Sequence, residues 1–170
     1  GPKMFQLYIH KDKGLTDNLI DRCKRSGFKA MCLTVDTVVA GNRERDHRWG
    51  FTTPPKLTLK SLLSFASHPL WSINYLTHEK FQLANVSHFT KKGSSIAKGV
   101  MEYINEQYDP KMNWADAEYC IKKWGGPFAI KGVMSVKDAK RAVDIGASAI
   151  MLSNHGGRQL DGSRSPFDQL

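Results

Sequence analysis

The stretch AIMLSNHGGR at residues 149–158 joins an apolar run to a polar turn that contains two glycines. The run at 149–152 has the continuous apolar character of a buried parallel strand. Because such a strand delivers the residues that follow it to the carboxyl edge of the sheet, where α/β proteins bind ligands, the turn is a candidate site. His155 offers an imidazole base, and Arg158 offers a planar fork suited to a carboxylate. Periodicity alone leaves an alternative open, which is a strand-ending turn with a surface histidine and arginine.

Strand and helix patterns alternate along the rest of the chain. Further strands are predicted at residues 5–9, 30–35 and 128–130. Helices are predicted from a cap at Thr16 to a stop at Gly27, from Asn113 to Gly125, and from Ser135 to Gly146. Short connections between strands and helices indicate an α/β fold with a parallel sheet and right-handed crossovers. The pattern does not separate a barrel from an open, doubly wound sheet.

Length and composition set further bounds. The chain has 170 residues, of which 41% are hydrophobic and 24% charged, as in globular proteins. A closed (β/α)8 barrel typically needs about 250 residues, so we expect an internal fragment of a larger enzyme. Three cysteines without metal-ligand spacing suggest reduced thiols in a cytoplasmic setting. The chain contains no run of 18 apolar residues, so no membrane-spanning helix is predicted.

The chain is strongly basic, with a formal net charge of +9 and a pI near 9.5. Such a balance suits nucleic acid or an anionic membrane surface. We do not expect nucleic acid as a partner, because the basic residues are scattered and no recognition motif is present. NAD is also unsupported, since no G-x-G-x-x-G string follows any strand.

Residues 51–112 fit no simple strand–helix unit and are predicted to be an insertion. Between 51 and 100, six lysines stand against Glu79 alone, and aromatic residues such as Trp71 and Tyr75 are interspersed. Apolar and aromatic residues mixed with basic charge are typical of a segment that lies on a membrane surface. A folded excursion packed on the rim of the sheet explains the same pattern equally well.

Four short strings occur in a fixed order: FQLY at 5–8, TVDT at 34–37, IKGV at 130–133 and SNHGGR at 153–158. Together they resemble the motifs of the FMN-dependent α-hydroxy acid dehydrogenases and oxidases. This resemblance implies part of a (β/α)8 TIM barrel, about strands three to six of eight, with the long insertion after the fourth strand. It also implies FMN as the cofactor and a small 2-hydroxy acid as the substrate.

The resemblance assigns catalytic and substrate-binding roles to five residues. His155 is the expected base, and Asp36 is expected to stabilise its imidazolium form, since both should reach the same rim of the sheet. Arg158 and Tyr8 are expected to hold the substrate carboxylate, and Arg43 to be a mobile second arginine that faces the substrate. Taken alone, Asp36 would be interpreted as a loop-capping aspartate.

The same resemblance assigns the cofactor contacts. Lys131 is expected to act in catalysis by stabilising the negative charge of reduced flavin, although a lysine that extends to solvent at the rim gives the same pattern. Gln6, Thr34 and Ser153 are the other expected flavin contacts. No metal site is predicted.

These assignments predict oxidation of an L-2-hydroxy acid similar to lactate to the 2-keto acid, with electrons passed from FMN to a quinone. An oxygen-using oxidase of the same family is the alternative, and a catalytically inert fragment is the third possibility. We expect the isolated fragment to be inactive and the parent enzyme to be a homo-oligomer. The parent is expected to be cytoplasmic, with peripheral attachment to an anionic membrane surface at the cytoplasmic face of the inner membrane.

Overall fold

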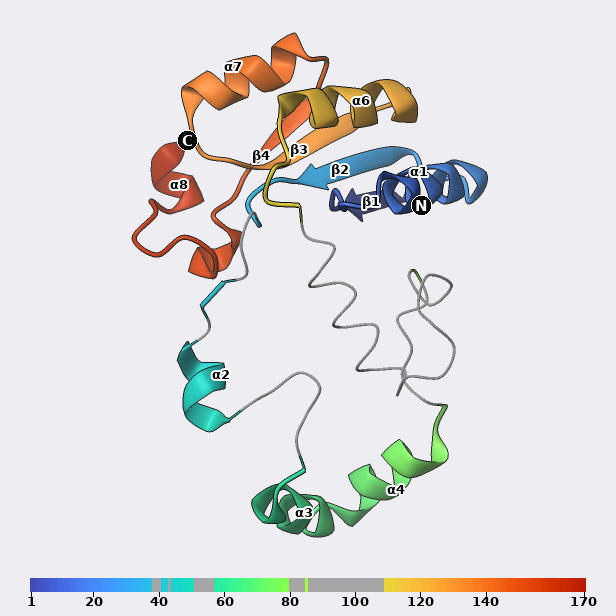
Figure 1. The fold of residues 1–170 in the computed structure, drawn as a ribbon, viewed down its shortest axis with the longest axis vertical. Coiled ribbons are helices and arrows are strands. Elements are labelled where there is room, and N and C mark those ends of the chain that lie inside the picture. Colours follow the sequence, from blue (N-terminus) through green and yellow to red (C-terminus); the bar gives the residue numbers. More distant parts are fainter. Residues whose placement is uncertain (38–40, 43, 51–56, 80–84, 86–108) are drawn as a thin grey trace. The chain divides into compact units, whose positions relative to one another are not determined.

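Four parallel strands form one sheet in the computed structural model, which describes residues 1–37, 41–42, 44–50, 57–79, 85 and 109–170. The strands are β1 (Met4–Leu7), β2 (Ala30–Thr34), β3 (Phe128–Val133) and β4 (Ala149–Leu152), and they lie side by side in the order β1-β2-β3-β4 (Figure 1). The three long helices that connect them are α1 (Lys13–Arg25), α6 (Trp114–Trp124) and α7 (Val136–Asp144). The parallel α/β prediction is therefore confirmed.

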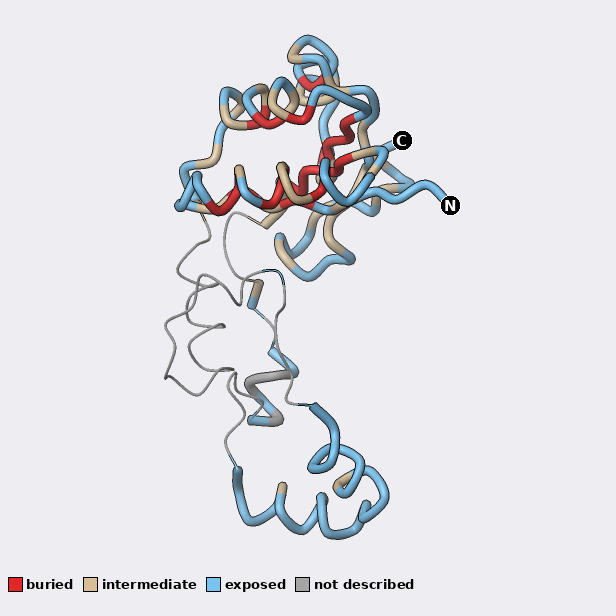
Figure 2. Tube along the Cα trace, turned by 90° about the vertical axis from the view of Figure 1, so that its right-hand side faces the viewer, coloured by how far each residue is buried: buried red, intermediate tan, exposed pale blue. Residues whose placement is uncertain are grey.

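The pairing register divides the sheet into two faces. Leu33 pairs with Leu7 on one side and with Ile130 on the other, and these three side chains are at most 1% exposed. The residues on the opposite face are Gln6, Cys32, Thr34, Ala129, Lys131, Ala149 and Met151. Most of the buried residues lie in the strands and in the helices α1, α6 and α7 (Figure 2).

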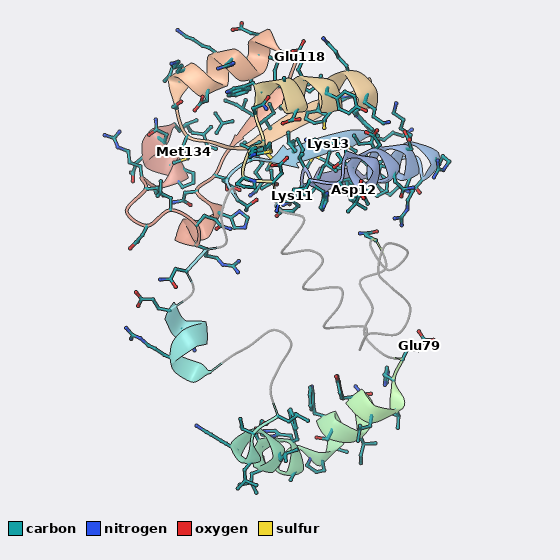
Figure 3. All side chains as sticks on the ribbon, in the orientation of Figure 1. Lys11, Asp12, Lys13, Glu79, Glu118 and Met134 are labelled. Atoms are coloured by element: carbon teal, nitrogen blue, oxygen red, sulfur yellow. The ribbon has the colours of Figure 1, made fainter. Side chains whose placement is uncertain are left out.

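The helices are held together by charge as well as by apolar burial. Lys13, at the start of α1, lies 2.8 Å from an oxygen of Asp116 on α6, and Figure 3 labels it beside the neighbouring Lys11 and Asp12. Further along the same two helices, the Tyr119 hydroxyl donates to Asp17 at 2.9 Å. Because α1 and α6 touch, the crossovers on either side of β2 run over the same face of the sheet.

Sequential strand order is the arrangement of a (β/α)8 barrel, whereas a doubly wound sheet reverses its order at a switch point and carries helices on both faces. The order β1-β2-β3-β4 contains no such reversal within the described residues. The place of these strands as the third to sixth of eight stays a prediction.

Two of the three predicted helix caps are confirmed. Asn113 accepts from the Ala115 N–H and forms a capping box with Asp116, and Ser135 accepts from the Asp138 N–H. The cap predicted at Thr16 is wrong, because α1 begins at Lys13 and Asp12 is its N-cap. Thr16 is instead buried inside the helix.

Residues 43–106 form a second compact unit, separate from the unit formed by 1–42 and 107–170. Its described helices are α2 (Glu44–Trp49), α3 (Leu59–Ala66) and α4 (Pro69–Thr77). No residue of α3 or α4 is buried, as the pale tube of Figure 2 shows. None of the described helices is long and apolar enough to cross a bilayer. The boundaries 51–112 that the sequence predicted for an insertion stay a prediction.

Two short elements follow β4 in the chain. A single 3₁₀ turn, η2 (His155–Gly157), comes three residues after the strand, and the short helix α8 (Pro166–Gln169) ends the chain. The first of these carries the histidine that the sequence singled out.

Candidate active site

Asp36 and His155 meet at the carboxyl edge of the sheet. Asp36 follows β2 by two residues and His155 follows β4 by three, and Oδ1 of the aspartate lies 2.9 Å from Nδ1 of the histidine. Both side chains are largely enclosed, with 10% and 19% of their surface exposed. Because an ionised carboxylate only accepts hydrogen bonds, this contact places the imidazole proton on Nδ1 and leaves the Nε2 lone pair available.

The second oxygen of Asp36 is shared by two donors. The Ser153 hydroxyl donates to Oδ2 at 3.3 Å, and the Lys131 ammonium lies 3.7 Å from the same atom. Lys131 is one-fifth exposed and stands on the sheet face opposite the helices. A lysine in such surroundings needs an anion nearby, and Asp36 supplies one.

The backbone of Gly132 lies close against Asp36. It is the extra residue of a β-bulge in β3, and its φ of +107° is a conformation that L side chains rarely adopt. A Cβ added at this position would lie 2.7 Å from the Asp36 Cβ. Only glycine therefore lets the carboxylate sit this close to β3. Gly132 stands in the IKGV string at 130–133, but sequence reasoning assigns it no role, because its neighbour Asp36 lies far away in the chain.

The turn that follows β4 is held by its own side chains. His155 has a φ of +58°, which is uncommon for a residue other than glycine. Its N–H donates to the Ser153 hydroxyl at 3.1 Å. Asn154 accepts from the Gly157 N–H and donates from its side-chain amide to the Arg164 carbonyl, so it ties both ends of the loop that carries Arg158. Sequence reasoning assigned no role to Asn154, because its partner lies ten residues further on.

The remaining predicted contacts lie along the same edge or on the same face. The Gln6 amide donates to the Tyr8 hydroxyl at 2.6 Å, which brings these two side chains together at the end of β1. Thr34 is 1% exposed, and its hydroxyl has no hydrogen-bond partner among the described residues. Because burying a hydroxyl without a partner is costly, Thr34 is an available group for a bound ligand.

Of the two arginines predicted to face the substrate, the structure describes Arg158 but not Arg43. Arg158 is exposed, and its backbone packs against Gly41, where an added Cβ would overlap the Arg158 carbonyl. This contact joins the loop after β2 to the loop after β4. Arg43 lies outside the described residues.

Two sulfur atoms lie on the open face of the sheet, where Cys32 Sγ is 3.6 Å from Met151 Sδ. Burial raises the pKa of the Cys32 thiol, with the charge of Lys131 opposing that effect. The thiol therefore stays protonated at neutral pH and is a packing group, as its place in an apolar strand predicts. Within the described ranges, no three His, Cys, Asp or Glu side chains are grouped so as to hold a metal ion.

The chain matches a known protein family over its whole length. The family model described as FMN-dependent dehydrogenase matches residues 1–170, and the chain belongs to that family. It is 42% identical over 166 residues to an L-lactate oxidase of Nostoc sp., covering 98% of this chain and 40% of that protein. It is 38% identical over 170 residues to an L-lactate dehydrogenase of Serratia proteamaculans, covering 99% and 44%.

The chain is also similar in structure to a solved dehydrogenase. The crystal structure of the monotopic membrane protein (S)-mandelate dehydrogenase superposes with a TM-score of 0.88 at 33% identity, over 99% of this chain and 44% of that one. The chain thus spans about two fifths of the length of the curated relatives described above.

The cofactor of the family is FMN, and the residues present fit it. The sheet face opposite the helices carries the buried Thr34 hydroxyl, which has no partner among the described residues, and the ammonium of Lys131, the residue that pairs with Thr34 in the register. An oxidised flavin offers hydrogen-bonding atoms along one edge, and its reduced form carries negative charge there. A hydroxyl and a fixed cation on one face suit both needs.

Proposed function

We propose that the protein carrying this chain oxidises an L-2-hydroxy acid similar to lactate to the corresponding 2-keto acid. The observation that supports this most directly is the Asp36–His155 pair, enclosed at the carboxyl edge of a parallel sheet with Lys131 beside it. A base held by a carboxylate is what abstraction of a proton from the substrate requires. The lactate enzymes among the relatives supply the substrate class.

His155 is the proposed base, acting through Nε2. Its Nδ1 hydrogen bond to Asp36 fixes the tautomer and the ring orientation. When Nε2 takes a proton from the substrate, the ring becomes a cation 2.9 Å from a carboxylate, and this contact stabilises the charged form. Asp36 therefore acts by orientation and charge, without itself accepting the proton.

Arg158 and Tyr8 are the proposed clamps for the substrate carboxylate. The guanidinium presents two parallel donors that match the two carboxylate oxygens, which orients the substrate as well as binding it. Tyr8 is held at the same edge by its hydrogen bond from Gln6. Arg43, from the loop after β2, is the proposed second arginine facing the substrate.

FMN, when bound, takes the two electrons that the oxidation releases. Gln6, Thr34, Lys131 and Ser153 are the proposed contacts to it. Lys131 would stabilise the negative charge of the reduced form, and its 3.7 Å contact with Asp36 keeps the ammonium in place before the cofactor is charged.

Replacement of the base tests the function. In a complete protein carrying this sequence, His155→Gln should lower kcat for every accepted 2-hydroxy acid by about 10²–10⁴-fold, the usual contribution of a general base. His78, which is exposed at the end of α4, provides the matched control, and His78→Gln should leave kcat unchanged. Near-normal turnover by His155→Gln at full FMN content would contradict the proposal.

We further propose that electrons leave the flavin for a membrane quinone, and that the segment 51–112 provides a peripheral membrane contact on the cytoplasmic face. The α3–α4 pair supports this, because it carries many apolar side chains and none of its residues is buried. Its most exposed large side chains are Leu59, Leu70, Tyr75 and Leu76, each at least 66% exposed. The structural relative (S)-mandelate dehydrogenase is itself a monotopic membrane protein.

Three aromatic rings are stacked within the α3–α4 pair. Trp71 stacks on Phe65 at 5.5 Å and on Tyr75 at 5.3 Å, and the three rings line a cavity of about 540 Å³ between the two helices. Tryptophan and tyrosine favour the headgroup level of a bilayer. Of the six lysines between 51 and 100, only Lys60 falls within the described residues.

An oxidase that passes electrons to oxygen is the second candidate, since one of the relatives described above is an L-lactate oxidase. The two functions use the same base and the same residues to bind the substrate carboxylate. They differ in the acceptor, quinone or oxygen, that takes electrons from the flavin. Measuring oxygen consumption and reduction of a soluble quinone analogue with the same substrate distinguishes the two: an oxidase consumes oxygen, whereas a dehydrogenase reduces the quinone analogue. A homo-oligomer, expected from the resemblance, stays a prediction.

A further inference from the structure

Ser153 occupies a central position between the two members of the Asp36–His155 pair. Its hydroxyl donates to Asp36 Oδ2 at 3.3 Å and accepts from the His155 backbone N–H at 3.1 Å. A serine hydroxyl has one proton and two lone pairs. The proton is therefore committed to Asp36, and one lone pair is committed to His155.

The contact with Asp36 fixes the orientation of the carboxylate. Oδ1 faces His155, while Oδ2 faces the Ser153 hydroxyl at 3.3 Å and Lys131 at 3.7 Å. Gly132 packs closely against the same residue, since a Cβ added there would overlap Asp36. Without the hydroxyl, the contact that the described residues leave at Oδ2 is the longer one to the Lys131 ammonium, and rotation about the Asp36 side chain is no longer opposed by a hydrogen bond from a hydroxyl.

The contact with His155 fixes the backbone of the base. A φ of +58° is unfavourable for a histidine, because its Cβ approaches the neighbouring carbonyl. The N–H of the same residue points back to Ser153 and holds the turn in this conformation. One side chain thus restrains the backbone of the base and the side chain of its partner at the same time.

We propose that Ser153 is a positioning residue for the base pair, in addition to any contact it makes with the flavin. The inference rests on the proposed function in taking His155 as the base. It also limits the flavin contact, because a hydroxyl that donates to Asp36 can only accept a hydrogen bond from the cofactor. Loss of the hydroxyl should therefore disturb the Asp36–His155 hydrogen bond before it disturbs FMN binding.

The test compares Ser153→Ala with Ser153→Thr in a complete protein carrying this sequence. The direct readout is the downfield proton resonance of the His155 Nδ1–H, which an imidazole hydrogen-bonded to a carboxylate gives in NMR spectra of protein labelled with ¹⁵N-histidine. We expect Ser153→Ala to lose or broaden this signal and Ser153→Thr to keep it. The kinetic readout is kcat at full FMN occupancy, which should fall about 10-fold or more in Ser153→Ala with little change in KM.

Ser148→Ala is the matched control, since the Ser148 hydroxyl also accepts from a backbone N–H, that of Phe128, just before β4 begins. It should keep both the resonance and kcat. A Ser153→Ala protein with an unchanged resonance and unchanged kcat would overturn the inference. Reduced FMN affinity with normal kcat in the loaded enzyme would also overturn it and make Ser153 a flavin ligand alone.

The outcome is separable from that of the proposed function. If His155→Gln keeps its turnover, the base assignment fails, but the effect of Ser153 on the Nδ1–H resonance still reports the hydrogen bond. If His155→Gln is inactive while Ser153→Ala is normal in both readouts, the function stands and the positioning role is wrong.

Discussion

Asp36 Oδ1 and His155 Nδ1 lie 2.9 Å apart although 119 positions separate the two residues in the chain. The pair forms because β2 and β4 flank β3 and end at the same edge of the sheet. Gly132 leaves room for the carboxylate, and Ser153 bonds both to the Asp36 side chain and to the backbone of His155. Substitutions at these positions should therefore change catalysis in distinct ways.

Asp36→Asn should leave the fold intact and lower kcat by about 10²–10⁴-fold. The amide has nearly the same shape, but its NH₂ group can donate to Nδ1 and so favour the tautomer whose Nε2 carries the proton. An imidazole in that tautomer cannot act as a base at Nε2. Steady-state kinetics at full FMN occupancy measure the effect. A base in the wrong tautomer should lose far more than about twofold in kcat. A kcat within about twofold of the unchanged protein would therefore show that Asp36 does not set the tautomer of His155.

Gly132→Ala should lower both stability and kcat. The φ of +107° alone costs about 1–3 kcal/mol for a residue with a Cβ, and the new methyl group would also press on Asp36. Gly146→Ala is the matched control, because Gly146 has a φ of +94° and its nearest neighbour is a flexible Ile121 methyl at 3.7 Å. Thermal unfolding should show a loss in both variants, whereas kcat should fall only in Gly132→Ala. Equal kcat in the two variants would contradict the contact.

Arg158→Lys should reduce kcat/KM while FMN content stays normal. Lysine keeps the positive charge but loses the two parallel donors that match a carboxylate, so the substitution is not conservative at such a site. Because Arg158 is exposed, its replacement should leave the unfolding temperature unchanged. An unchanged kcat/KM with full flavin occupancy would remove Arg158 from the substrate site.

The exposed apolar residues of α4 should drive membrane binding. Replacing Leu70, Trp71 and Leu76 by serine is expected to reduce co-sedimentation of the complete protein with anionic vesicles. The basic residues of the same segment add about 1 kcal/mol per charge near the surface, so binding should also weaken as salt rises. Val136 and Val143 of α7 are each 66% exposed, and their replacement by serine is the control. Equal sedimentation of both variants would contradict the membrane contact.

Stability should fall as the pH drops below about 6.5 because of His10. Burial lowers the pKa of His10 below its ordinary value of 6.5, with the charge of Asp12 opposing the shift, and its Nδ1 has no hydrogen-bond partner among the described residues. The unfolded chain therefore binds the proton more readily than the folded protein, and acid favours unfolding. One such group contributes a slope of at most about 1.4 kcal/mol per pH unit.

Urea unfolding measured across the range from about pH 5 to pH 8, where histidine titrates, checks this. His10→Asn should flatten the decline below the ordinary histidine pKa of 6.5, whereas the exposed His78→Asn should not. The same decline in both variants would show that His10 is not its source.

The strand and helix order was predictable because it depends on local patterns. Continuous apolar runs mark β2 and β4, and the caps at Asn113 and Ser135 follow from side chains that bond to backbone only two or three residues away. Thr16 shows the limit of the same reasoning, since its hydroxyl accepts from the His10 N–H and not from the first turn of a helix. A serine or threonine near a helix start has several backbone partners within reach, and packing selects among them.

The alternation of strands and helices and the residues delivered to the carboxyl edge can be predicted from the chain alone, because both follow from backbone periodicity and strand direction. Three relations are visible only in the folded molecule: the strands run in sequential order, Gly132 leaves room for Asp36, and Ser153 bonds to both members of the base pair. These relations join residues up to 119 positions apart, and their distances are set by sheet register and by a single bulge in β3. A change of one residue in that register would turn every side chain of a strand to the opposite face. Continuous apolar runs such as β2 and β4 do not alternate, so their residue pattern does not specify which face each side chain takes.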